Sequence, residues 1–197
     1  CELSRICSHL GYLGRVLEAV GYDIMGSQVA IQREKVLKLM ETITGARLLP
    51  NFIRIGGVRK DITPEKLLMV KKALPELLHK IRALELSMLE NILVFNRLQS
   101  KGIISREQAM QYGLTGPNLR AAGVRKDLRK DSGYLLYEGV SFTTPLGRQG
   151  DALERVTVRF KEIYQSLRII NHGINHIPEE EIKVVSRFNI AGLPFRS

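Results

Sequence analysis

The sequence lacks tryptophan and contains only two cysteines among its 197 residues. Cys1 and Cys7 fit neither a CxxC pair nor the disulfide framework of a small secreted domain, so we expect two ordinary buried thiols. A phosphate-binding P-loop, a GxGxxG fingerprint, a nucleophile elbow and a zinc-binding cysteine cluster are also missing from the sequence. Taken by themselves, the residues therefore name no reaction.

Long apolar runs are absent as well. Nowhere do about eighteen apolar residues follow one another, so we expect no segment that spans a bilayer, and no signal-peptide pattern precedes the first helix. A protein of this kind that works at a membrane would reach it through partner subunits. The chain begins at Cys1 inside a helical pattern and ends at Ser197 without a closing element, so we expect it to be part of a longer protein.

The charge balance is basic, with 30 Lys and Arg against 20 Asp and Glu, which gives a formal net charge of +10. Such an excess can attract nucleic acid over long distances. Here, however, basic and acidic residues alternate, as in residues 125–131, and no pattern of aromatic residues suits the stacking of bases. We therefore expect no nucleic-acid partner. The hydrophobic content of 44% is sufficient for the core of a single domain.

Apolar residues at helical spacing dominate the chain, which predicts a mainly α fold with short β segments. Ser27 is the expected N-cap of the second helix, and the first two helices should form an antiparallel pair. Pro75 should kink or split the third helix. Residues 51–58 have a β-like pattern that includes paired glycines, whereas residues 115–147 are rich in Gly and Pro and should be mostly irregular. The predicted helices cover about residues 2–20, 27–44, 63–98, 105–112 and 151–175.

Five polar residues of the last predicted helix share one face at spacings of three or four: Asp151, Arg155, Arg159, Glu162 and Ser166. A stripe of this kind is most often a solvated surface. The alternative is a set of charges that pair inside a large assembly, where an unpaired member would cost several kcal/mol. The spacing alone leaves both interpretations open.

The histidines give no strong sign of chemistry. His9 shares a helix face with Glu2 and Arg5, where a structural role is the usual one. His172 and His176 have the i, i+4 spacing of metal ligands, but no third ligand is in view. We therefore expect no metal site.

Several segments in fixed order resemble one family. The pattern is similar to the quinone-side catalytic subunit, or D-type subunit, of NADH:quinone oxidoreductase, respiratory complex I, which is itself related to the large subunit of nickel-iron hydrogenases. The resemblance implies a helical bundle of that type and covers most of the chain. Its motifs are ELxRxxxHL at residues 2–10, REK at 33–35, TGAR at 44–47, RxGGV at 54–58, the glycine-rich segment 113–123, DLRK at 127–130, Tyr134 with Tyr137, and residues 147–170.

The resemblance implies a subunit of the quinone-reduction module, on the cytoplasmic side of the inner membrane of a bacterium or archaeon. Its partners would be a B-type iron-sulfur small subunit, a C-type subunit and membrane-arm subunits, through which it contacts the membrane. Quinone would be the substrate, the iron-sulfur cluster would belong to the partner, and NADH and FMN would bind at distant subunits. Electron transfer would be coupled to proton translocation, and the segment alone would be inactive.

The resemblance also assigns roles to particular positions. No catalytic residue is implied within these 197 residues, because the quinone-binding His and Tyr of the family lie upstream. The candidates near quinone or cluster are Arg54, Gly56, Gly57, Leu49 and Ala19. A structural charge network would comprise Arg5, His9, Arg33, Glu34, Asp127, Arg129, Asp151, Arg155, Arg159 and Glu162.

Two positions depart from the family pattern. Ala19 stands where the family has an Asp that is thought to couple to the quinone-binding His, and Leu49 stands where a His often lies near the cluster. Losing a titratable His beside a cluster removes a site that takes up a proton on reduction. We therefore expect a terminal cluster of low and weakly pH-dependent potential, suited to menaquinone or to a ferredoxin-type donor.

Two other classes of function remain open. One is the large subunit of a membrane-bound, energy-converting nickel-iron hydrogenase, in which four cysteines outside this region would bind the metals. The other is a non-enzymatic helical scaffold or basic binding module, which would keep the fold without the chemistry.

Overall fold

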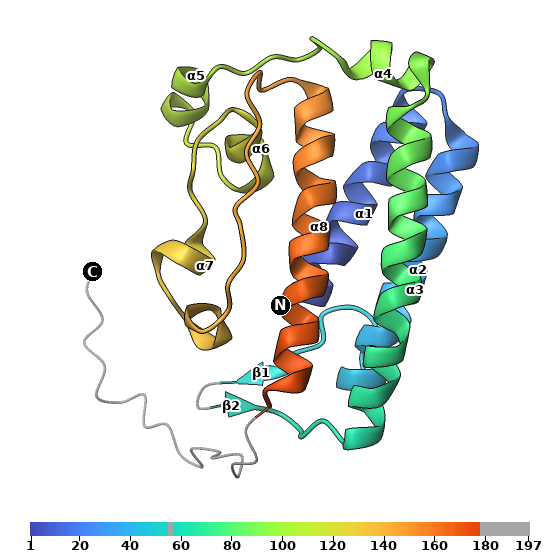
Figure 1. Cartoon of the computed structure of the whole chain (residues 1–197), viewed down its shortest axis with the longest axis vertical. Helices are drawn as coiled ribbons and strands as arrows, with labels where there is room; N and C mark the ends of the chain where they lie inside the picture. The colour runs from blue at the N-terminus through green and yellow to red at the C-terminus, as the bar shows by residue number, and fades with distance from the viewer. Residues whose placement is uncertain (55–56, 178–197) are drawn as a thin grey trace.

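The computed structural model describes residues 1–54 and 57–177, with only the backbone described at residue 54. Long helices run along the longest axis of the molecule (Figure 1), which confirms the mainly α class. Helix α8, Ala152–Asn175, contacts α1, α3 and α6 and carries one side of the main core. Among the described helices, none combines the length and the apolar character needed to cross a membrane.

Helices α1, Glu2–Ala19, and α2, Asp23–Thr44, form an antiparallel pair joined by a short turn. Gly14 and Gly26 face each other, and a Cβ on Gly26 would lie 3.3 Å from the Gly14 carbonyl oxygen, so the two helices approach closely. Helix α2 begins at Asp23 instead of near Ser27, because the Gly26 amide already bonds to the Tyr22 carbonyl at 3.1 Å. Gly45 ends α2 in the left-handed conformation.

Helix α3 spans Pro64–Leu89 and continues through Pro75. Pro75 lies on the exposed face, where water can bond the carbonyl that loses its amide partner. The break comes instead before α4, Ile92–Leu98, where the Asn91 side chain accepts hydrogen bonds from the Leu93 and Val94 amides. This break changes the helical phase, so Ile92 is 65% exposed, although it follows the buried Met88 at the helical spacing of four.

The β-like segment is a small antiparallel hairpin in which strand β1, Ile53–Arg54, pairs with β2, Gly57–Val58. Ile53 lies opposite Val58 across the pair. Gly56, one of the candidate residues, lies outside the described residues. The hairpin is at the end of the bundle where α2 ends and α3 begins (Figure 1).

The segment between α4 and α8 contains short helices. One of them confirms the helix predicted at 105–112, and the others lie within residues 115–147, where the sequence predicts mostly irregular structure. The capping box of α5 forms as expected from Ser105 and Gln108. The other elements lack a long apolar period. The segment packs closely on itself, since a Cβ on Gly147 would lie 2.3 Å from the Ala121 carbonyl oxygen, and its residues 116–121 contact α8. The short helices are α5, Arg106–Gln111, α6, Gly116–Ala121, α7, Leu128–Asp131, and the 3-10 helix η1, Leu135–Glu138.

Candidate functional site

A groove of about 630 Å³ runs between α1, α2 and the loop of residues 45–50. Small residues from both helices form part of its lining, among them Gly11, Gly14 and Gly26. Charged side chains and exposed leucines line it as well, namely Arg15, Glu18, Arg33, Arg47, Leu48 and Leu49. The groove therefore combines a surface without bulky side chains with arginine charges and exposed apolar groups.

Two arginines of the groove are positioned by contacts with α1 and α2. The Arg33 side chain crosses Gly11, where a Cβ would lie 3.3 Å from its Nε. Arg47 donates hydrogen bonds from both terminal nitrogens to the Glu34 carboxylate, across the start of the loop. This hydrogen-bonded pair lowers the pKa of Glu34. The ion pair ties residue 47 of the loop to α2.

The two cysteines lie in different environments. Cys7 is buried on α1, as expected, and its burial raises the pKa of the thiol above the ordinary value. Cys1 is exposed instead of buried, because it precedes the first turn of α1 at the edge of a cavity.

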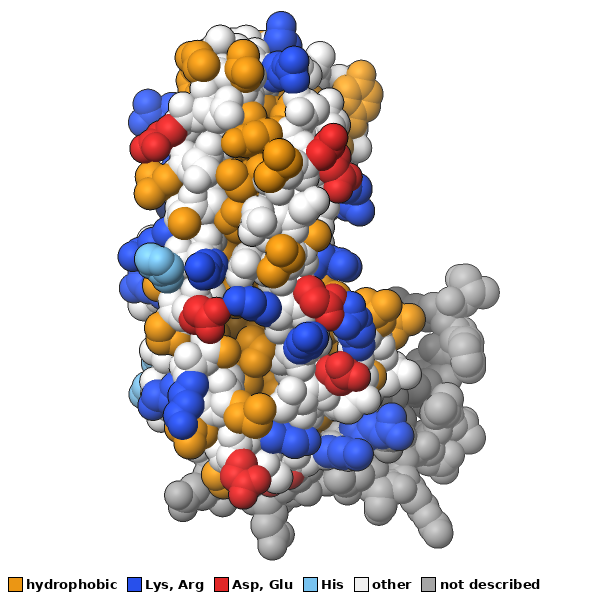
Figure 2. All heavy atoms as spheres, turned by 90° about the vertical axis from the view of Figure 1, so that its right-hand side faces the viewer, with side chains coloured by type: hydrophobic (Ala, Val, Ile, Leu, Met, Phe, Trp, Pro, Cys, Tyr) orange, Lys and Arg blue, Asp and Glu red, His pale blue; other side chains and the backbone are white. Residues whose placement is uncertain are grey.

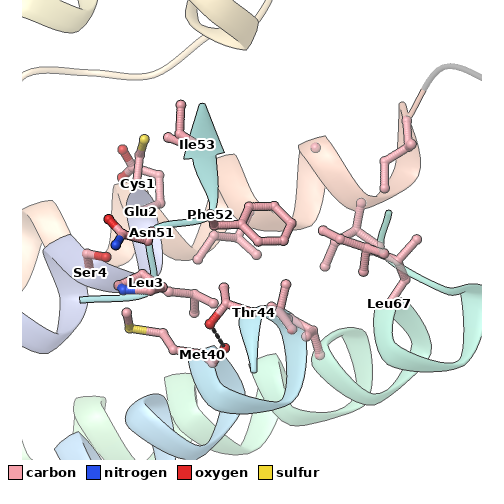
Figure 3. A pocket seen from close by; sticks show the side chains of 18 residues that line it. Cys1, Glu2, Leu3, Ser4, Met40, Thr44, Asn51, Phe52, Ile53 and Leu67 are labelled. Atoms are coloured by element: carbon pink, nitrogen blue, oxygen red, sulfur yellow. Dashed lines mark hydrogen bonds between the residues drawn. The ribbon is translucent and has the colours of Figure 1, made fainter. Parts of the chain in front are cut away.

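That second cavity, of about 550 Å³, has a mainly apolar lining and lies beside the hairpin. Figure 3 shows that Phe52, which directly precedes β1, and Leu67 of α3 extend into the cavity. Leu3 of α1 and Met40 of α2 lie at its other end. The Thr44 hydroxyl donates to the Met40 carbonyl oxygen at 2.8 Å, which satisfies this polar group at the wall. Pro50 lines both the cavity and the groove, so the two lie on either side of the same loop.

A cluster of buried charges lies where α1 meets α8. Glu162 of α8 accepts a hydrogen bond from His9 Nε2 at 2.8 Å and another from Arg120 Nε, and its side chain is fully buried. We use the name charge cluster for the buried residues Glu2, His9, Arg120, Asp127, Arg129, Tyr137 and Glu162. Because each of these carboxylate oxygens has a donor, the cost of burying the charge is offset by strong hydrogen bonds.

The second part of the charge cluster centres on Arg129 of α7. Arg129 donates from Nε and Nη2 to the two oxygens of Asp127 at 3.0 and 2.8 Å, and from Nη1 to Glu2 at 3.2 Å. The Tyr137 hydroxyl donates to the other Glu2 oxygen. Arg129 therefore links α1 to α7, and Tyr137 adds η1 to the same group.

The pKa directions agree with this pairing. Burial alone would raise the pKa of Glu162, but the hydrogen bonds from His9 and Arg120 and the Arg120 charge outweigh it and lower the pKa. Burial lowers the pKa of His9, with Arg159 and Arg5 adding to the effect against the opposing influence of Glu162. Near neutral pH, Glu162 is therefore ionised and His9 is neutral.

The polar stripe of α8 is not a solvated face, because Asp151, Arg159, Glu162 and Ser166 are all buried. Asp151 caps α8 by accepting from the Glu154 and Ser100 amides, both at 2.8 Å. The two arginines of the stripe bond to neighbouring groups instead of to acids: Arg155 donates to the Gly150 carbonyl oxygen at 2.8 Å, and Arg159 donates to Asn118 at 3.0 Å while its guanidinium lies over the Tyr12 ring.

His172 and His176 stack on each other with ring centroids 4.0 Å apart. The Nδ1 atom of His176 is 2.8 Å from the His172 carbonyl oxygen, so backbone contact occupies one ring nitrogen. Across residues 1–54 and 57–177, no group of three or more His, Cys, Asp or Glu side chains is arranged to hold a metal ion.

A sequence model of the family described as respiratory-chain NADH dehydrogenase, 49 kDa subunit, matches residues 20–192. The chain belongs to this family. The D-type subunit of NADH-quinone oxidoreductase from Methylacidiphilum infernorum is 40% identical over 183 residues, and subunit 4 of the Thermus thermophilus enzyme is 39% identical over 176 residues. These alignments cover 93% and 89% of this chain but only 44% and 43% of the relatives, so the chain spans less than half their length.

Among solved structures, one similar chain belongs to the membrane-bound sulfane sulfur reductase, an archaeal respiratory membrane complex. It is 35% identical, with a TM-score of 0.86, and the match covers 92% of this chain and 49% of that one. The fold of this member of the 49 kDa subunit family is thus shared with a chain of that archaeal complex.

Within this family member, the candidates near quinone or cluster do not all gather at one point. Leu49 lines the groove and is 89% exposed, whereas Ala19 is exposed at the end of α1, next to Glu18 of the groove lining. Arg54 and Gly57 belong to the hairpin, beside the apolar cavity. The structure therefore offers two candidate surfaces, joined at the loop of residues 45–50.

Of the residues assigned to the charge network, Arg33 and Glu34 lie at the groove and outside the buried cluster. Three central members were not assigned from the sequence, namely Glu2, Arg120 and Tyr137. Glu2 did carry a signal, because it shares a helix face with Arg5 and His9. Arg120 and Tyr137 follow segments without a long apolar period, so no helical pattern indicated which way they face.

Proposed function

We propose that this chain is the quinone-module subunit of a complex I type NADH:quinone oxidoreductase, with an iron-sulfur partner subunit packed over the groove. The NADH-quinone oxidoreductase relatives, at 39–40% identity over about nine-tenths of this chain, support the class of enzyme. The groove carries the proposal for the partner's position, because exposed Leu48 and Leu49 lie beside arginines. Apolar anchors next to arginine are typical of the centre of a protein interface.

In this proposal the chain forms one wall of the quinone site and supplies charged groups near it, whereas the reactive groups belong to other subunits. The partner would hold the cluster, quinone would bind between the two subunits, and NADH and FMN would bind at distant subunits. The complex would lie at the cytoplasmic side of the membrane, and other subunits would translocate protons. The charge cluster behind α1 would keep the groove rigid, because it fixes α1 against α8 and α7.

The groove would also influence the redox potential of the partner's iron-sulfur cluster. Arginine side chains stay charged across the range in which quinone enzymes work, so Arg15, Arg33 and Arg47 would act on a nearby cluster by a constant amount. Among the described residues that line the groove there is no histidine. The weakly pH-dependent cluster potential inferred at Leu49 is consistent with this lining.

The test is assembly of the full-length protein with its cluster-bearing partner. We expect a Leu48→Asp, Leu49→Asp double variant to lose the partner and quinone reductase activity together, because the two apolar anchors are lost and two charged groups would have to give up their hydration in the interface. The matched control is Leu93→Asp on α4, an exposed leucine at the opposite end of the bundle. Normal assembly of the double variant would remove the groove from the interface.

A second candidate function is the large subunit of a membrane-bound, energy-converting nickel-iron hydrogenase. It is favoured by Ala19 at the position of the quinone-coupling Asp. The similarity to a chain of the sulfane sulfur reductase, with a TM-score of 0.86, adds only that this fold also occurs in a complex that is not named a quinone oxidoreductase. Metal analysis of the purified complex separates the two. Nickel bound by cysteine pairs near the two ends of the full-length chain would support the hydrogenase, and its absence together with quinone reduction would support the oxidoreductase.

A further inference from the structure

A third pocket, of about 400 Å³, lies between α1, α6 and α7. Within the part of the chain that the structure describes, it shares no lining residue with the groove or the apolar cavity. Its lining includes the side chains of Arg5, Arg120, Lys126 and Arg129, with Asp127 as the acidic member. We call it the basic pocket. Neither the groove nor the proposed quinone chemistry uses it.

Arg5 differs from the other arginines of this pocket. Arg129 is bonded to Asp127 and Glu2, and Arg120 donates to Glu162 and, at 3.0 Å, to the Lys126 carbonyl oxygen. Among the residues that the structure describes, the Arg5 side chain makes no hydrogen bond, and its buried Nε has no partner. Its nearest carboxylate oxygens, on Glu2 and Glu162, are 3.5 and 3.9 Å away.

The basic side chains of this pocket outnumber the carboxylates beside them by one. Glu2, Asp127 and Glu162 are ionised. Burial alone would raise the pKa of each, but Tyr137 and Arg129 beside Glu2, Arg129 beside Asp127, and His9 and Arg120 beside Glu162 lower it. Arg120 and Arg129 hydrogen-bond to these carboxylates, whereas Arg5 only approaches Glu2 and Glu162 and, among the described residues, keeps its donors free. Lys126, exposed at the edge, adds a positive charge that none of these carboxylates balances.

We propose that the basic pocket binds one carboxylate group, with Arg5 as its main ligand and Lys126 at the rim. A guanidinium group offers parallel N–H donors that match the two oxygens of a carboxylate. One unbalanced positive charge suits a monoanion better than a phosphate, which carries about two negative charges. The carboxylate could come from an acidic side chain of a neighbouring subunit or from a free organic acid.

The test uses the full-length protein with acetate as the probe, at constant ionic strength against chloride. Acetate should raise the thermal unfolding temperature of the wild-type protein with saturation. Arg5→Gln should weaken acetate binding by about tenfold or more, because it removes a charge-assisted contact. Lys126→Gln, at an exposed position, should weaken it by about threefold. Arg168→Gln, an exposed arginine of α8, is the matched control and should bind acetate as the wild type does.

The assembled complex distinguishes the two sources. If a neighbouring subunit supplies the carboxylate, acetate loses its effect in the complex and Arg5→Gln weakens assembly, whereas a free organic acid would leave the acetate effect intact. The proposal is overturned if acetate does not stabilise the wild-type chain, or if Arg5→Gln and Lys126→Gln respond as the control does. A stronger response to inorganic phosphate than to acetate would also overturn it.

Discussion

At the scale of single residues, Leu49 has an unusual setting. Its backbone is left-handed, with φ of 47°, and its side chain projects from a loop held by the Arg47 and Glu34 pair. A leucine exposed in this way gains little from the folded chain itself. Contact with a partner would explain why an apolar side chain occupies this position.

Replacing Leu49 with histidine should therefore change the redox behaviour of the partner's cluster. A histidine that binds a proton when the cluster is reduced makes the midpoint potential fall as pH rises, by up to about 59 mV per pH unit for one electron. We expect a shallow slope in the wild-type complex and a steeper one in Leu49→His, measured by redox titration of the cluster signal. Leu49→Gln, which is polar but does not titrate, should keep the shallow slope. A steep wild-type slope near neutral pH would contradict this interpretation.

His9 gives a prediction about pH and stability. Burial lowers the pKa of His9 below its ordinary value of 6.5, so the unfolded chain takes up a proton at a higher pH than the folded chain does. The stability that comes from neutral His9 is therefore complete above pH 6.5 and is lost as pH falls below that value. Glu162 and Glu2, whose pKa values are lowered from 4.5, lose their contributions at still lower pH.

The measurement is the free energy of unfolding of the full-length protein by urea between about pH 4 and 8. His9→Gln keeps a donor near Glu162 but cannot titrate, so it should remove the decline that begins near pH 6.5 and keep the later one. His79→Gln is the control, on a different helix and outside the charge cluster. An unchanged profile in His9→Gln would show that His9 is not buried in its neutral form.

At the scale of elements, Gly150 joins the irregular segment to the start of α8. Its φ is +67°, and a Cβ would lie 2.1 Å from the Ile104 carbonyl oxygen, in a place where the backbone cannot move away easily. The Ile104 amide bonds to the Gly150 carbonyl oxygen at 3.0 Å, so two backbone segments meet without room for a side chain.

Gly150→Ala should accordingly be more destabilising than a substitution that strains only the backbone. Gly113→Ala is the matched control, since Gly113 has φ of +63° but nothing within 4 Å of an added Cβ. We expect about 1 kcal/mol for Gly113→Ala and at least about 2 kcal/mol more for Gly150→Ala, from chemical unfolding of the full-length protein. Equal losses would mean that the contact with Ile104 relaxes at little cost.

Elements with a strong apolar period could be predicted from the sequence, and α1 and α8 lie within one residue of the expected bounds. The errors came where another local interaction decided the boundary. The Asn91 cap divides the third predicted helix although Pro75 does not, and α2 starts before Ser27 without a side-chain cap. The short helices α6 and α7 depend on contacts with α8 and α1, which no local pattern reveals.

The same reasoning applies to the candidate site. The face shared by Arg5 and His9 could be predicted from spacing, because α1 is regular. The partners of these residues could not, since Glu162 lies 153 positions away from His9 and Arg129 lies 127 positions away from Glu2. Whether a charged stripe is solvated or buried depends on the elements packed over it, and here these are α1 and the segment between α4 and α8.

At the scale of the whole molecule, the two sides of the helix bundle differ. One side is exposed to water or to partners, whereas the segment between α4 and α8 covers the other. Figure 2 shows the outer face near α2 and α3, where apolar side chains lie among charges of both signs. Exposed Ile31, Leu68, Met69 and Leu86 belong to these two helices. The opposite side of α8 is covered by the short helices and held by the charge cluster.

Arg129 is the residue on which that closure depends most. Its guanidinium is almost fully buried, bonds to Asp127 and Glu2 and lies 4.6 Å from the centre of the Phe142 ring. Arg129→Met keeps much of the volume but leaves two carboxylates buried without their cation, which should cost about 3–5 kcal/mol. Chemical unfolding of the full-length protein measures this loss.

Two comparisons show whether the loss comes from unpaired charge. Arg125→Met, an exposed arginine in the same segment, should change stability by less than about 0.5 kcal/mol. Adding Asp127→Asn to Arg129→Met should restore part of the loss, because one of the two stranded carboxylates is then neutral. If the double variant is no more stable than Arg129→Met, the lost packing against Phe142 and Tyr137 is the dominant effect, and the closure of the segment over α8 rests on apolar contact instead of charge.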